Sequence, residues 1–286
     1  MTAILARERY LAARDFIERE ARPLDRALLR QGLGEADGAA VIAELAPFQN
    51  LDGGFGHGLE PDLATPASSA LATSIGLRLA RRAGAGADHP MVRAALAWLA
   101  ANLDGETGVW PIVPRAVEDA PHAPWWTWSE QLAENWNGFR FNPTAELLAA
   151  LYVWRAAVDP KVLAKAEAAM RRAIAETPVI DGAYDLKCAV RLAETTQAPA
   201  DLRAALTALV VRSVADHDPD DEHLPALERP PVRGAWWSRR WDRAWTPRPG
   251  GSSRPRTPTA AGRPSGIGVS WTRPPGRRPG ATGAAG

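Results

Sequence analysis

The residues best suited to chemistry follow a glycine-rich segment and read GHGLEPD. His57, Glu60 and Asp62 place one imidazole and two carboxylates in one short loop. Such a set can transfer protons or hold a divalent metal. The alternative is a capping role, in which Asp62 or Thr65 begins the helix that follows. Because histidine is scarce here and functional residues concentrate in loops, we name His57, Glu60 and Asp62 as the candidate catalytic residues.

A second candidate site is the aromatic-rich region between Gly108 and Phe141. Its rings could enclose a hydrophobic ligand, stabilise a cation or stack on a sugar. They could equally anchor a long loop that folds over the helices. Disordered segments are poor in aromatic residues, so we expect this region to be packed. The candidate ligand-binding residues, with one from the glycine-rich segment, are Phe55, His122, Trp125, Trp126, Trp128, Phe139 and Phe141.

Metal chemistry is not expected from the cysteine content. Cys188 is the only cysteine, so neither an internal disulfide nor a thiolate cluster can form. We expect its side chain to be a small buried apolar group. No metal ligand is predicted, and the sequence leaves any cofactor unknown.

The elements that would position these residues are helices. Apolar residues recur at helical spacing, and no run shows the alternation typical of strands. Proline near position 23 predicts a break in the first helical stretch. The helices come in pairs, which is typical of a repeat array. The expected ranges are 3–30, 38–46, 68–82, 89–101, 142–154, 160–176, 184–195 and 199–214.

The segment FQNLDGGFGHGLEPD carries a recognisable pattern, in which Gln49, Gly53 and Phe55 stand as Q-x3-G-x-F. Weaker copies occur at 102–110 and at 181–184. The pattern resembles the QW-type repeat of squalene-hopene cyclases and the related repeats of prenyltransferase β-subunits. This resemblance implies an all-α fold, an incomplete α/α toroid of helix pairs over residues 1–228. It also implies that the Gln49 amide ties a helix start to the neighbouring turn, with the aromatic ring stacked over it.

The resemblance implies a prenyltransferase- or terpene-cyclase-like protein with a hydrophobic, aromatic-lined cavity and an undefined reaction. Asp218, Asp220 and Asp221 match the D-x-D-D acid motif of class II cyclases, but short acidic runs are usually solvated. The zinc ligands of prenyltransferases are not reproduced, because Cys188 follows Asp185 by three residues rather than two. The alternatives are a non-catalytic helical-repeat binding protein, a nonfunctional truncated copy, or a carbohydrate-active α/α barrel.

The charge is divided unevenly along the chain. Residues 230–286 contain eleven Arg, ten Pro, ten Gly and five Trp, and Asp242 is their one acid. The preceding residues are therefore acidic overall and offer no basic face for nucleic acid. No apolar run is long enough to span a bilayer, so a cytoplasmic protein is the default expectation. A hydrophobic small molecule is the expected partner, and the oligomeric state is not predicted.

The composition of residues 229–286 predicts a disordered tail that is translated out of frame. Such a tail is rich in Arg, Pro and Gly, but five tryptophans are unusual for a linker. In another reading frame, the codons of residues 257–262 permit Asp-Ala-Asp-Gly-Gly-Trp, which repeats the glycine-rich turn. We therefore expect a frameshift between about His223 and Val232. The coding DNA tests this, because a stop codon in that frame would exclude it.

Overall fold

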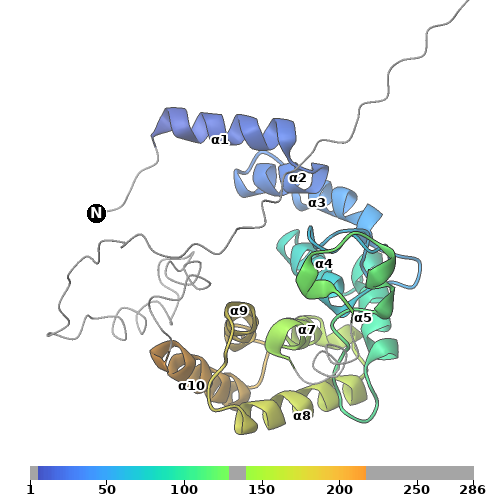
Figure 1. Ribbon diagram of the computed structural model, residues 1–286, viewed down its shortest axis with the longest axis vertical. Coiled ribbons are helices and arrows are strands. Elements are labelled where there is room, and N and C mark those ends of the chain that lie inside the picture. The colour runs from blue at the N-terminus through green and yellow to red at the C-terminus, as the bar shows by residue number, and fades with distance from the viewer. Residues whose placement is uncertain (1–5, 129–139, 217–286) are drawn as a thin grey trace, which may run out of the picture. The chain divides into compact units, whose positions relative to one another are not determined.

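The computed structural model describes residues 6–128 and 140–216 (Figure 1). Within those ranges it contains nine α-helices and no strand, only isolated bridges between loops. The predicted all-α class is therefore confirmed. Phe139, the D-x-D-D motif and the proposed boundary between 1–228 and 229–286 lie outside the described residues.

The helices agree closely with the ranges expected from the sequence, and the break before Pro23 is confirmed. Ser69 caps the helix after the GHGLEPD loop, where its Oγ accepts a hydrogen bond from the Ala72 N–H at 3.0 Å. The alternative capping role, in which Asp62 or Thr65 begins that helix, is therefore wrong. The helices are α1 Arg7–Glu20, α2 Pro23–Gly32, α3 Gly38–Leu45, α4 Ala70–Arg82, α5 Pro90–Asn102, α7 Phe141–Val153, α8 Pro160–Glu176, α9 Ala183–Ala193 and α10 Ala200–Asp216.

Most of these helices pack as consecutive pairs. Helix α4 packs on α5, α7 on α8, and α9 on α10 (Figure 1). The first members of the pairs also contact one another, because α7 packs against both α4 and α9. Helix α7 is apolar on most sides, and Leu147, Leu148 and Leu151 are fully buried in it. Burial on several sides is what a helix between two neighbours requires.

A glycine-rich turn precedes the first helix of each pair and contacts the second helix. Gly53 has φ +95°, and a Cβ on it would lie 2.4 Å from the carbonyl oxygen of Ala94 in α5. Gly108 has φ +75°, and its Cβ would lie 2.8 Å from the carbonyl oxygen of Lys165 in α8. Glycine is required in both turns, because an L side chain has neither the backbone conformation nor the space.

The third turn is linked to α10 by a hydrogen bond of the residue that precedes it. The N–H of Ile180 donates to Oγ of Ser213 in α10 at 2.8 Å. The first two turns thus approach α5 and α8 through a glycine, whereas the third turn is linked to α10 by a hydrogen bond of the preceding residue.

The first turn contains the predicted glutamine bridge. Nε2 of Gln49 donates to the carbonyl of Gly53 in its own turn and to that of Met91 in the first turn of α5, both at 2.9 Å. This prediction is confirmed. Phe55, the aromatic residue of this pattern, is fully buried, and a Cβ on Gly76 of α4 would lie 2.6 Å from its ring. Close contact with a glycine therefore fixes the ring against α4.

Candidate functional site

His57 lies on the surface of the GHGLEPD loop. It has φ +55°, an uncommon conformation for a residue with a side chain. Its Nε2 lies 2.7 Å from Oδ1 of Asn50, and Nδ2 of Asn50 donates to the carbonyl of Pro66 at 2.8 Å. The imidazole is thus tied to the first glycine-rich turn.

Asp62 is held by two tryptophans of the aromatic-rich region. Nε1 of Trp125 donates to one carboxylate oxygen and Nε1 of Trp126 to the other, each at 2.9 Å. The backbone N–H of Ala123 donates to the carbonyl of Asp62 at 2.9 Å. The structure therefore brings together one predicted catalytic residue and two predicted ligand-binding residues. In this arrangement the carboxylate joins two loops.

Glu60 is half-buried in the same loop, and this environment changes its acidity. Burial raises the pKa of the Glu60 carboxyl, and the nearby Asp62 carboxylate raises it further. Arg22 and Arg78 oppose this shift in pKa. Arg22 also donates to the carbonyl of Gly58 at 3.0 Å, which fixes the loop against the start of α2. A raised pKa suits a proton donor, although structural networks produce such shifts as well.

The other predicted ligand-binding residues are spread over the loop and α7. Nδ1 of His122 lies 2.8 Å from the carbonyl oxygen of Ala120, which fixes the ring against its own loop. Trp128 packs against a small apolar cluster, and its backbone N–H donates to the Glu118 carboxylate. Phe141 is buried at the start of α7. Trp125 is the exception, since 61% of its surface is exposed.

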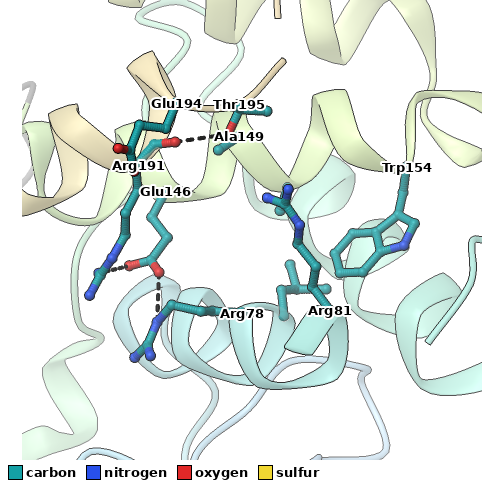
Figure 2. A pocket seen from close by; sticks show the side chains of 10 residues that line it. Arg78, Arg81, Glu146, Ala149, Trp154, Arg191, Glu194 and Thr195 are labelled. Carbon is teal, nitrogen blue, oxygen red and sulfur yellow. Dashed lines mark hydrogen bonds and ion pairs between the residues drawn. The ribbon is translucent and has the colours of Figure 1, made fainter. Parts of the chain in front are cut away.

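Sequence reasoning missed a cavity of about 370 Å³ between α4, α7 and α9 (Figure 2). Its lining combines apolar side chains with five charged groups. We call it the arginine cavity. It is lined by Leu77, Arg78, Arg81, Glu146, Ala149, Ala150, Trp154, Arg191, Glu194 and Thr195.

Glu146 lies at the centre of the charged side (Figure 2). Its side chain is 9% exposed, and Arg191 donates to Oε2 at 2.8 Å. Arg78 Nε lies 2.7 Å from Oε1, which is an ion-pair distance. Oε1 nevertheless has no hydrogen-bond partner, so the guanidinium attracts it by charge without an aligned N–H. A buried carboxylate oxygen that lacks an aligned donor can still accept a hydrogen bond.

Arg81 is the free cation of the cavity. Within the described ranges its guanidinium has neither an ion pair nor a hydrogen bond. Figure 2 shows this group in the space between Glu146 and Trp154. An unpaired guanidinium beside an apolar wall is suited to an anionic ligand.

Cys188 lies directly behind the charged side. Its exposed fraction is 3%, which confirms the expected burial, and its Sγ lies 3.8 Å from Oε2 of Glu146. Burial and the Glu146 charge both raise the pKa of the thiol. The thiol therefore stays protonated and supports the Glu146 carboxylate as a weak donor.

The positions of charged residues in the helix sequences indicate that charged side chains meet at this cavity. Glu146 is the only charged residue in the otherwise uncharged α7 sequence FNPTAELLAALYV. Buried charges need partners, so this residue predicts cations from neighbouring helices. Arg78 and Arg81 are three positions apart on α4 and therefore share one face. Arg191 of α9 supplies the third cation. From the sequence alone, an exposed helix face and a contact with a diphosphate explain this arginine equally well.

Comparisons with protein-family models, curated proteins and solved structures find no match. In the residues that the structure describes, no group of three or more His, Cys, Asp or Glu side chains could hold a metal ion. None of the helices in those ranges combines the length and apolar character needed to cross a bilayer.

Proposed function

We propose that this protein is a prenyltransferase- or terpene-cyclase-like α/α toroid repeat protein that binds an organic ligand in the arginine cavity. The arginine cavity itself carries the proposal, because it combines an apolar wall with unsatisfied polar groups. Leu77, Ala149 and Trp154 form the apolar wall, and Arg81 and Glu146 provide the polar groups. Ligand sites typically have this composition.

The recurring turns support the toroid part of the proposal. Each glycine-rich turn precedes an inner helix and contacts the outer helix of the same pair. The inner helices α4, α7 and α9 are then neighbours, as helix pairs arranged around a centre require. The bridge made by Gln49 is the feature that the QW-type repeat implies.

A defined reaction is not part of the proposal. Both oxygens of Asp62 already accept indole N–H groups, and His57 is bound to Asn50. Their catalytic role stays a prediction and would require these contacts to rearrange. Binding without chemistry needs no such rearrangement, so we propose a binding protein first and an enzyme second.

A fluorescent apolar anion, 1-anilinonaphthalene-8-sulfonate, tests whether the cavity is used. Ala150 is half-buried and lines the cavity, so Ala150→Trp should place an indole ring in that space. Ala101 is exposed near the end of α5 and lies outside the cavity, so Ala101→Trp is the matched control.

We expect Ala150→Trp to weaken binding of the dye by at least about tenfold, since the ligand loses its space. Ala101→Trp should bind like the wild type. Circular dichroism would confirm that both variants fold. Equal affinity in the two variants would contradict the use of the cavity.

A second candidate function is carbohydrate binding at Trp125. Its ring is largely exposed and lies beside the Asp62 carboxylate, and sugars stack on exposed aromatic faces close to polar groups. The Trp125→Ala variant should then lose binding to an oligosaccharide panel, while Trp98→Phe, a change of a buried indole in α5, should not. Retention by Trp125→Ala would reject this candidate.

A further inference from the structure

The charges around the arginine cavity are unbalanced by one. Three guanidinium groups, those of Arg78, Arg81 and Arg191, face the two carboxylates of Glu146 and Glu194. One positive charge therefore remains without a counter-charge in the cavity lining. A ligand with one negative charge would neutralise it, whereas a diphosphate would leave an excess of negative charge.

Among the described residues that line the cavity, Arg81 is the guanidinium group without an ion pair. Arg78 and Arg191 both form ion pairs with Glu146, at 2.7 and 2.8 Å. Arg81 has no such partner in the part of the chain that the structure describes. Its planar guanidinium matches the two oxygens of a carboxylate, which fixes where the anionic end of a ligand would lie.

Glu146 adds a requirement for a hydrogen-bond donor. Its Oε1 is buried and lacks a hydrogen bond, although the side chain lines the cavity. Buried carboxylate oxygens are nearly always hydrogen-bonded, so a ligand donor at this place would complete the site. A hydroxyl group fits better than an ammonium group, because the three neighbouring guanidinium groups would repel a further cation.

From these observations we infer that the arginine cavity binds a hydroxylated monocarboxylic acid with an apolar body. The carboxylate pairs with Arg81, the hydroxyl donates to Oε1 of Glu146, and the apolar body lies against Leu77 and Trp154. This inference rests on the proposed use of the cavity and specifies the class of ligand.

A series of four phenyl compounds that differ in one group tests the inference. The series is 3-phenyllactate, 3-phenylpropanoate, phenylalanine and 3-phenylpropan-1-ol, measured by calorimetric titration. We expect 3-phenyllactate to bind at least about tenfold more tightly than 3-phenylpropanoate or phenylalanine, as one well-made hydrogen bond to a charged group gives. The neutral alcohol should bind most weakly, because it does not pair with Arg81.

Arg81→Ala should weaken binding of 3-phenyllactate by about tenfold or more and remove the advantage of the acids over the alcohol. Arg93 is an exposed arginine of α5 outside the cavity, so Arg93→Ala is the matched control and should bind like the wild type. Both residues are exposed, and both variants should therefore fold.

Three results would overturn the inference: equal binding of acid and alcohol, equal binding of 3-phenyllactate and 3-phenylpropanoate, or no binding of any compound at about 10 mM. Failure of the proposed function is a separate result. It would appear as dye binding that Ala150→Trp does not change, whatever the ranking of these four compounds.

Discussion

The first and second glycine-rich turns, at residues 49–55 and 104–110, connect to α5 and α8 through different side chains. In the first turn the partly buried amide of Gln49 reaches the carbonyl of Met91 in α5. In the second, Nδ2 of Asn102 donates to Trp98 within its own helix. Contact with α8 is made instead by Lys165, whose Nζ donates to the carbonyl of Gly105 at 2.6 Å.

The aromatic residues that follow the two glycines also differ. Phe55 packs against Gly76 of the following helix, α4. Trp110 is 1% exposed and donates from Nε1 to the carbonyl of Leu99 in the preceding helix, α5, at 2.8 Å. The features common to both turns are a glycine with positive φ and its close approach to the second helix of the pair, α5 or α8. The two turns therefore share their backbone geometry, whereas their side-chain contacts differ.

The largest loss of stability should come from replacing the glycines of the two turns with alanine. Gly53→Ala should lower the free energy of unfolding by about 3 kcal/mol, because it combines a positive φ with a 2.4 Å approach to a backbone oxygen. Gly108→Ala, with a 2.8 Å approach, should cost about 2 kcal/mol. Urea unfolding followed by circular dichroism measures both.

Gly34→Ala separates the stability lost through a positive φ from the stability lost through close contact with a neighbouring helix. Gly34 has φ +73°, and no atom lies within 4 Å of the position that a Cβ would take. Gly34→Ala should therefore cost only about 1 kcal/mol, for the backbone conformation alone. If all three variants lose the same stability, the close approach of Gly53 to α5 and of Gly108 to α8 contributes nothing to stability.

The next largest loss of stability distinguishes the side-chain amide of Gln49 in the first turn from that of Asn102 before the second. Gln49→Ala removes the side-chain donor to the carbonyls of Gly53 and Met91 and should cost about 2 kcal/mol. Asn102→Ala removes a part-buried hydrogen bond within α5 and should cost about 0.5 kcal/mol, because it joins no second element. Thermal unfolding of the two variants would show this ranking, and a larger loss for Asn102→Ala would reverse our assignment of the bridging role.

The first turn was predictable from the sequence because its contacts are local or follow from a recurring motif. Gln49, Gly53 and the helix after the turn lie close together in the chain, and glycine in such a place has few alternatives. The cap of α4 was predicted wrongly because several residues before Ser69 have suitable side chains. Only the path of the chain decides among them, and here Asp62 turns toward Trp125 and Trp126.

The arginine cavity was not predictable in the same way. Its charged residues come from three helices that are far apart in the sequence, and they meet because α7 packs against both α4 and α9. Helical periodicity shows which residues share a face, but it does not show which faces meet. Glu146 alone, as a charge in an apolar helix, indicated that cations would approach it.

The smallest expected effect is a difference in pH dependence between the two turn regions. Glu60, after the first turn, has its pKa raised above the ordinary value of 4.5 by burial and by Asp62. The folded state therefore favours the protonated carboxyl, and stability falls as the pH rises from below 4.5 through the folded pKa. Glu60→Gln should remove this fall and be the more stable protein at neutral pH.

Asp104, in the second turn, should behave in the opposite way. Hydrogen bonds from the backbone and side chain of Thr107, followed by one from the Glu106 N–H, lower its pKa below the ordinary value of 3.8. Its contribution to stability is present above 3.8 and is lost as the pH falls through the folded pKa. Asp104→Asn should therefore be less stable than the wild type at neutral pH, and this difference should disappear in acid.

Urea unfolding of both variants at several values between about pH 3 and pH 7 tests the contrast. The quantity compared is the difference in free energy of unfolding between each variant and the wild type, plotted against pH. Opposite slopes for the two variants would show that one turn region buries its carboxylate while the other satisfies it with N–H and O–H donors. Slopes of the same sign would mean that the two carboxylates experience similar surroundings, and the distinction between a buried loop and an exposed turn would then be wrong.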